Sequence, residues 1–233
     1  MGELPDSVRT LERELRGVFG PRLQSLLVFG QRAAAHAAPT RTMALVESLT
    51  EQDLRACAAR ASSWHAARLA TPLVVAARDL PRSLDVFPLE FAAIAADHVV
   101  VAGEEPFKSV SVDAGDLRRA CEVQARSHLL HLREGFIDAG GNSHALAVLI
   151  VDSAGPLASL LTSVARLEGR SDVDPEAAGR HAEHALRLGG GTLTDVVKLV
   201  KVHEISAAEA ERIFPTYLAA IERLVEYVDG WAR

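Results

Sequence analysis

The spacing of apolar residues changes near residue 112, and this change restricts the chain to a fold with two different halves. Before it, short runs rich in β-branched residues alternate with helical patterns. After Asp113 no run is typical of a strand. We therefore predict an α/β domain over residues 1–112 and a helical bundle over residues 113–233. The predicted strands are SLLVFG, MALVESL, PLVVAA, SLDVFPL and HVVVAG.

Residues 113–233 have the spacing of amphipathic helices. Between Leu117 and Phe136, apolar residues recur every three or four positions along one helical stripe, and Gly140-Gly141 ends this helix. Four more helices are expected: from about Ser143 with a kink at Gly155-Pro156, after Asp174-Pro175, after LGGGT, and from a capping box at Ser206-Glu209 with Pro215 inside.

In residues 1–112 we predict a small mixed sheet with helices on one side. A first helix begins with Asp6 or Ser7 as its N-cap and closes at Gly20-Pro21. The segment TEQDLRACAARASSWHAARLA predicts a single second helix, with Thr50 as its cap and Asp53 at the third helical position.

Composition excludes several classes of protein. The chain is 48% hydrophobic, which is typical of a globular and not a disordered protein. A net charge of −6 gives no basic footprint, so we expect no strong nucleic-acid binding. The longest apolar run is broken by Asp152 and by Gly155-Pro156, and the N-terminus has no apolar secretory core. We therefore expect a soluble, cytoplasmic protein without a membrane span, in which Cys57 and Cys121 are reduced core thiols.

The segment LLVFGQRAAAHAAPTRTMALVESL reads as a strand, a loop that starts with glycine, and a second strand. This order resembles the catalytic segment of the nucleotidyltransferase superfamily, and the resemblance covers residues 5–110. In that family the first strand leads into Gly-Ser, the next carries Asp-x-Asp, and a later strand carries a third carboxylate. The resemblance implies two metal ions that bridge a triphosphate and activate the attacking oxygen.

The defining motifs of the family are altered in this chain. Gly30 matches the glycine and Gln31 replaces the serine, while Thr42 and Ala44 stand at the two aspartate positions. In SLDVFPLEF, Asp85 matches the third carboxylate. The segments DHVVVAGEEPF and FPTYLAAIERLVEYVD are similar to the next strand and to the bundle of minimal and aminoglycoside-type nucleotidyltransferases.

A threonine hydroxyl and an alanine methyl cannot hold Mg²⁺, which prefers carboxylate oxygens. We therefore expect no metal site, no catalytic residues and no required cofactor. The resemblance implies a pseudoenzyme that binds a nucleotide such as ATP, or another small ligand, without strong dependence on Mg²⁺. The expected binding residues are Gly30, Gln31, Arg32, Arg41 and Asp85. The alternative is that these polar side chains lie on a solvated loop and that Asp85 caps a turn.

Two other functions remain open. An active nucleotidyltransferase would need Glu47 or Glu90 to rebuild the metal site with Asp85, and alternation along the strands points both glutamates away from it. The other function is that of an interaction module, a regulatory subunit that forms a homo-oligomer or binds a protein partner through its bundle.

Histidines in the second half give weaker signals. His128 with His131, and His181 with His184, have the i, i+3 spacing of half a metal site, but no third ligand is defined. Arg126 and His131 fit an R-x4-H pattern that chance alone produces at this composition. The run of glycines at 189–191 is interpreted as a helix end and hinge.

Overall fold

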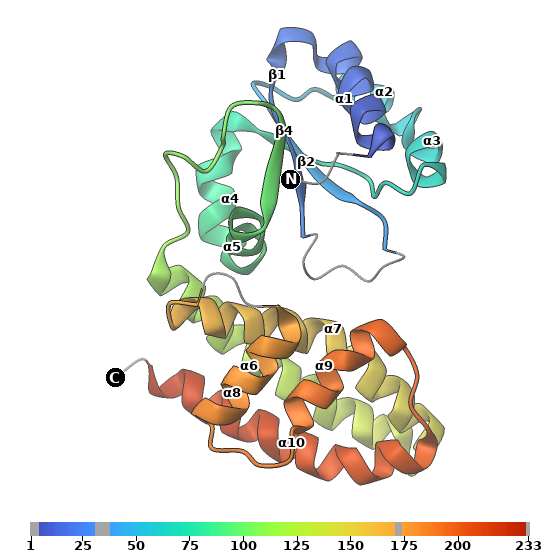
Figure 1. Ribbon diagram of the computed structural model, residues 1–233, viewed down its shortest axis with the longest axis vertical. Coiled ribbons are helices and arrows are strands. Elements are labelled where there is room, and N and C mark those ends of the chain that lie inside the picture. Colours follow the sequence, from blue (N-terminus) through green and yellow to red (C-terminus); the bar gives the residue numbers. More distant parts are fainter. Residues whose placement is uncertain (1–4, 31–37, 171–173, 232–233) are drawn as a thin grey trace. The chain divides into compact units, whose positions relative to one another are not determined.

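The computed structural model describes residues 5–30, 38–170 and 174–231. Contacts between Cα atoms divide the chain into two compact units, Met1–Val112 and Asp113–Arg233. The first contains a four-stranded mixed sheet with helices, and the second is helical (Figure 1). This architecture confirms the predicted fold class.

The strands of the sheet lie in the order β3-β2-β1-β4. The central strand β1 pairs antiparallel with both β2 and β4, whereas β2 and β3 are parallel. Each of these strands overlaps one of the predicted runs, although β1 and β2 each begin two residues earlier. Their bounds are Leu23–Phe29 for β1, Arg41–Val46 for β2, Leu73–Ala76 for β3 and His98–Gly103 for β4.

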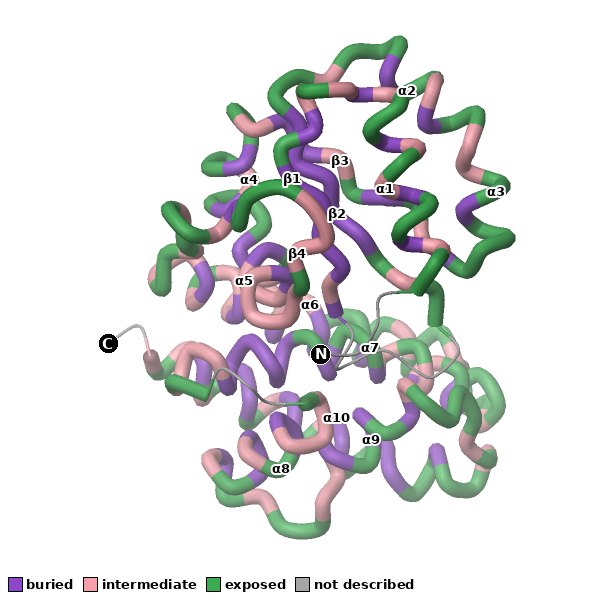
Figure 2. Tube along the Cα trace, turned by 45° about the horizontal axis from the view of Figure 1, so that its top comes forward, coloured by how far each residue is buried: buried purple, intermediate pink, exposed green. Residues whose placement is uncertain are grey.

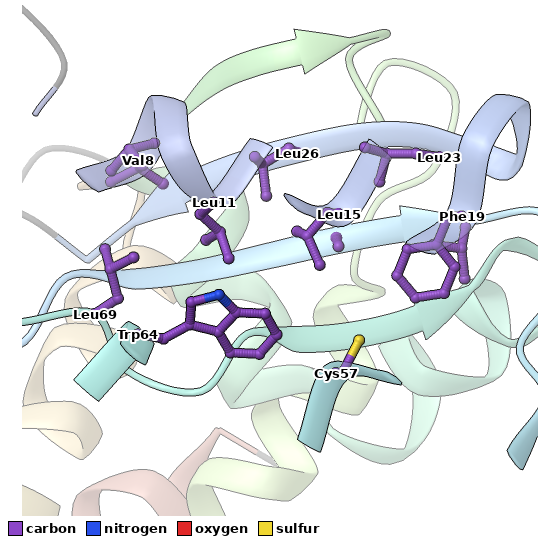
Figure 3. Close-up of a cluster of buried hydrophobic side chains, with 12 residues drawn as sticks. Val8, Leu11, Leu15, Phe19, Leu23, Leu26, Cys57, Trp64 and Leu69 are labelled. Carbon is purple, nitrogen blue, oxygen red and sulfur yellow. The ribbon is translucent and has the colours of Figure 1, made fainter. Parts of the chain in front are cut away.

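One face of the sheet is covered by α1, α2 and α3. Leu26 and Val28 of β1 and Ala44 of β2 point to this face and pack against the apolar side of α1 and against Trp64 (Figure 3). The helices are α1 at Asp6–Phe19, followed by a 3-10 turn at Gly20–Arg22, α2 at Glu51–Ala58 and α3 at Ala61–Ala66.

The opposite face is also covered, so the prediction of helices on one side only is wrong. Leu27, Met43 and Leu45 point to this face and pack against α4 and α5. The sequence of β2 is consistent with this, because a strand that is buried on both faces is a continuous apolar run such as MALV and does not alternate apolar with polar residues. A 3-10 turn at Ala77–Asp79 leads into α4 at Leu80–Val86, and α5 spans Pro88–Ala96.

The predicted strand SLDVFPL is wrong, because residues 80–86 form α4 and Pro88 begins α5. Leu80 and Leu84 are four residues apart and both buried, which is helical spacing. Pro88 occupies the first turn of its helix, where a missing N–H has no cost. The adjacent Val86 and Phe87 resemble a strand in the sequence but are exposed at the junction of the two helices.

The start of α2 is fixed as predicted, although the helix is shorter. Thr50 and Asp53 form a capping box, and Arg22 binds the Asp53 carboxylate through two hydrogen bonds of 2.8 Å. The Arg22 guanidinium lowers the pKa of Asp53, so this carboxylate stays charged. The single helix predicted over residues 50–70 is divided at Arg60, whose guanidinium caps the carbonyl of Ala56 at 2.6 Å.

At the N-terminus, α1 begins at Asp6, and neither Asp6 nor Ser7 is its N-cap. The residue before the helix is Pro5, which makes no side-chain cap. Asp6 lies in the first turn, where its negative charge suits the helix dipole. Gly20, with φ of 57°, ends the helix as predicted.

The second unit is a bundle of five described helices. Asp113, Asn142, Asp174 and Ser206 cap four of these helices through their side chains. Burial follows the inner sides of the helices (Figure 2). The bounds are Ala114–Ala139 for α6, Ser143–Leu167 for α7, Pro175–Ala185 for α8, Thr192–Val202 for α9 and Ala207–Gly230 for α10.

The central helix α7 begins at Ser143, as predicted, and extends to Leu167. It continues through Asp152, Gly155 and Pro156, so it is long and apolar enough to span a membrane by length and composition. Its buried residues extend from Leu146 to Ala165 and it contacts each of the other bundle helices. In this structure α7 is therefore the core helix of the bundle.

Candidate functional site

One end of the sheet brings together side chains from three strands. Phe29, the last residue of β1, pairs with Arg41 of β2 on one side and with His98 of β4 on the other. Paired residues in antiparallel strands point to the same face of the sheet. Arg41, Phe29 and His98 therefore form a row at the point where the chain leaves β1 for the loop.

Arg41 lies over the backbone of Gly30. Its guanidinium carbon is 5.0 Å from the centroid of the Phe29 ring, a cation–π contact. Gly30 has a φ of 69°, which favours glycine, and a Cβ atom there would lie 2.0 Å from Arg41 Nη2, so a larger residue would also displace this guanidinium. Within the described residues no carboxylate forms an ion pair with Arg41, which leaves an exposed cation at the mouth of the loop.

Thr42 and Ala44, which stand at the family's aspartate positions, are both buried. Ala44 packs in the cluster under α1, and Thr42 points to the same face of β2 because it is two residues away. The Thr42 hydroxyl has no hydrogen-bond partner among the described residues. These positions are part of the core beneath the helices, and a carboxylate there would be costly to bury.

The carboxylates considered for a metal site lie elsewhere. Asp85 is on the exposed side of helix α4, so it is not the third strand carboxylate that the sequence predicted. Glu90 is on α5, and the alternation argument used for it does not apply to a helix. Glu47 follows the end of β2, where its N–H donates to the carbonyl of Arg22. Gln31 and Arg32 lie outside the described residues.

The family's two Mg²⁺ ions do not fit the residues of this sheet. None of the four described strands contains an aspartate or a glutamate. No group of three potential ligands among histidine, cysteine, aspartate and glutamate occurs in the described parts of the chain. Because Mg²⁺ needs several oxygen ligands in octahedral geometry, the side chains of the sheet supply no site for it.

Sequence reasoning assigned the segment DHVVVAGEEPF to a strand and loop but missed the pairing of His98 with Glu105. Both ring nitrogens of His98 face acceptors: Nδ1 is 3.0 Å from the Ile94 carbonyl and Nε2 is 2.8 Å from Glu105 Oε2. Only the imidazolium form donates to both. Burial opposes ionisation of Glu105, but hydrogen bonds from His98 and from the Phe107 N–H hold its pKa below its ordinary value. The signal in the sequence was a histidine at the first position of an apolar run.

Three histidines of the bundle have side-chain partners. His128 Nε2 is 2.6 Å from the hydroxyl of Tyr217 in the core, and His131 contacts Ser127 at the surface. His181 forms an ion pair with Glu168. Neither predicted i, i+3 pair is part of a metal site in the described residues.

The remaining sequence patterns are also part of the framework. Arg126 of the R-x4-H pattern forms an ion pair with Asp229. Glu183 accepts hydrogen bonds from the N–H and hydroxyl of Thr194 and so completes the first turn of α9. The glycines at 189–191 do not end α8, whose C-cap is Leu186; instead Gly191, with φ of 72°, is the N-cap residue of α9.

Comparison with known proteins finds a similar fold among solved structures. No family model matches the chain, and no curated protein matches it. Among solved structures, it is similar to a spectinomycin adenyltransferase from Enterococcus faecialis, determined with ATP and spectinomycin. The TM-score is 0.60 at 8% sequence identity, over 96% of this chain and 98% of that one. At this identity the likeness shows a shared fold alone.

Proposed function

We propose that this chain is a nucleotidyltransferase-like pseudoenzyme that binds a nucleotide or another small ligand at the end of the sheet and does not transfer a nucleotidyl group. One observation carries this proposal: the four described strands contain no carboxylate, and the two aspartate positions hold buried Thr42 and Ala44. Transfer in this superfamily depends on metal ions held by such carboxylates. A sheet without them keeps the fold and loses the chemistry.

The cationic end of the sheet supports binding of an anionic ligand. Arg41 is exposed, lies over Gly30 and Phe29, and presents a guanidinium that can bind a phosphate through two parallel hydrogen bonds. The positive φ of Gly30 lets the backbone approach a ligand closely at the start of the loop. Gln31 and Arg32 are the next residues along the chain, and we include them in the proposed site with Asp85 as a peripheral member.

We expect no metal-dependent nucleotidyl transfer. The full chain would be incubated with labelled ATP, GTP, CTP or UTP, with Mg²⁺ or Mn²⁺, and with acceptors that include aminoglycosides. Without paired carboxylates the triphosphate has no metal to neutralise it in the transition state, so pyrophosphate release should stay at the level of heat-treated protein. Release that requires metal and disappears in Asp85→Ala would show a rebuilt active site.

Nucleotide should bind with little help from Mg²⁺. Calorimetry with ATP, in EDTA or in excess Mg²⁺, should give dissociation constants that differ by less than about threefold, because arginine and backbone N–H groups must neutralise the phosphates. Arg41→Ala should weaken ATP binding about tenfold, the loss expected for one charge-assisted contact. Arg55→Ala, an exposed arginine paired with Glu51 on α2, is the matched control and should leave it unchanged. A tenfold gain on adding Mg²⁺ would mean that a carboxylate binds metal at the site.

A second candidate function is an interaction module that pairs with itself, and one feature of α6 favours it. Val123, Leu130 and Ile137 repeat every seven residues and are 69%, 62% and 75% exposed. A heptad repeat of apolar residues is typical of helix pairing. Light scattering and a thermal-shift screen with nucleotides separate the two candidate functions. A stable dimer whose melting temperature does not change with nucleotide favours the interaction module, and a rise in melting temperature on adding nucleotide favours the pseudoenzyme.

A further inference from the structure

The bundle contains a cavity that the function proposed above does not use. It has a volume of about 310 Å³ and lies where the C-terminal turn of α6, the start of α7 and the first half of α10 meet. All of its lining residues belong to the second unit, so the cavity is separate from the cationic end of the sheet. This volume is at the lower limit of ligand pockets and suits a molecule with a single ring.

Aromatic side chains form one wall of the cavity. The rings of Phe136 and Phe214 are stacked, with centroids 4.5 Å apart and planes inclined by 11°. Phe214 is buried, whereas Phe136 is 49% exposed at the edge of the cavity. Leu146 and Pro215 add apolar surface to the lining. An aromatic ring that enters beside Phe136 would cover this exposed apolar surface and extend the stack.

The polar side chains of the lining are those of Asn142, Ser143 and Glu211, and only Glu211 carries a charge. Glu211 lines the cavity, and its Oε1 accepts a hydrogen bond from Ser143, so Oε2 can accept another donor. Pro215 has no N–H, so the carbonyl of Glu211, four residues earlier, lacks its normal helical donor. None of the described lining residues is basic. The one charged group among the described lining residues is therefore the Glu211 carboxylate.

We propose that this cavity binds a small aromatic amine in its protonated form. The ring would lie against Phe136, Phe214 and Leu146, and the ammonium group would donate to the Glu211 carboxylate. An anion of the same size would face the uncompensated charge of Glu211, and a neutral ligand would gain no charge-assisted hydrogen bond. The Glu211 carboxylate thus selects for a cation, and the stacked rings select for an aromatic body.

Matched small molecules test this proposal on the full chain. The probes are 2-phenylethylamine, 2-phenylethanol and 3-phenylpropionate. Binding of each is measured by ligand-observed and protein-observed NMR titration at pH 7. The amine should bind about tenfold more tightly than the alcohol, and the carboxylate should not bind. Equal affinity for amine and alcohol, or no amine binding at millimolar concentration, would overturn the proposal.

Variants separate the ring contact from the charge. Phe136→Ala should abolish binding of the amine without unfolding the bundle, because this side chain is half exposed. Glu211→Gln keeps an acceptor for Ser143 but removes the charge, so the preference for the amine over the alcohol should disappear. Glu134→Gln, an exposed α6 residue outside the lining, is the matched control and should bind like the parent chain. If folded Glu211→Gln still binds the amine more tightly than the alcohol, the Glu211 charge does not select the ligand, and its role is the hydrogen bond with Ser143 that joins α10 to the start of α7.

Discussion

Leu129→Asp should lower the melting temperature of the chain by roughly 10 °C or cause it to aggregate. Leu129 is buried in the middle of α6, on the stripe that faces the bundle, and α6 contacts both α7 and α10. Burying an unpaired carboxylate there costs several kcal/mol, which is comparable to the whole stability of a domain. Differential scanning calorimetry with size-exclusion chromatography measures both outcomes.

Glu134→Ala is the control for this substitution. Glu134 lies on the exposed side of the same helix, and its loss should change the melting temperature by no more than a degree or two. The two substitutions together test which face of α6 packs in the bundle. If Leu129→Asp melts within a degree or two of the parent chain and keeps its oligomeric size, the stripe faces solvent in solution.

The bundle could be predicted from the sequence because its signals are local. The apolar stripe from Leu117 to Phe136 has helical spacing, and Gly140, with φ of 56°, ends α6 where the sequence placed its end. Ser206 likewise accepts the N–H of Glu209 at the start of α10. Periodicity and caps act over one or two helical turns, so a single sequence is enough to recognise them.

The layer formed by α4 and α5 could not be predicted in the same way. Val86, Phe87 and Pro88 have the composition of a strand, and only the burial of Leu80, Leu84 and the residues of α5 against the sheet shows that the segment is helical. Short apolar segments do not distinguish a buried helix from a strand by composition alone. This error also placed Asp85 on a strand and made it the third carboxylate of the site.

The site was predicted only in part. The family motif located Gly30, and Arg41 was selected as a basic residue near the loop; the structure places the Arg41 guanidinium over Gly30 and Phe29. The motif did not locate His98, because the pairing of β4 with β1 joins residues that are far apart in the chain. The burial of Thr42 beneath the helices could not be predicted either, because the environment of β2 depends on which helices cover each face of the sheet.

Acidification should destabilise the bundle through His128. This side chain is buried in α6, with Tyr217 of α10 at 2.6 Å and Ser153 of α7 at 3.0 Å from the Tyr217 hydroxyl. Burial, with a smaller contribution from His131, lowers the pKa of His128 from 6.5 to about 4. Burial raises the pKa of Tyr217, so its hydroxyl stays protonated, and no carboxylate bonded to this network is available to stabilise an imidazolium in the described residues.

The sign of the effect follows from the lowered pKa. The unfolded chain binds the proton near pH 6.5 and the folded chain only near pH 4, so the stabilisation from neutral His128 is complete above pH 6.5 and is lost as the pH falls to about 4. Between pH 7.5 and pH 5 this loss amounts to about 2 kcal/mol. His128→Gln removes the titration, so the stability difference between parent and variant in urea unfolding should shrink by that amount over the same interval. A difference that stays constant from pH 7.5 to pH 5 would mean that His128 takes up its proton in the folded chain as readily as in the unfolded one, and that the core around Tyr217 admits the charge.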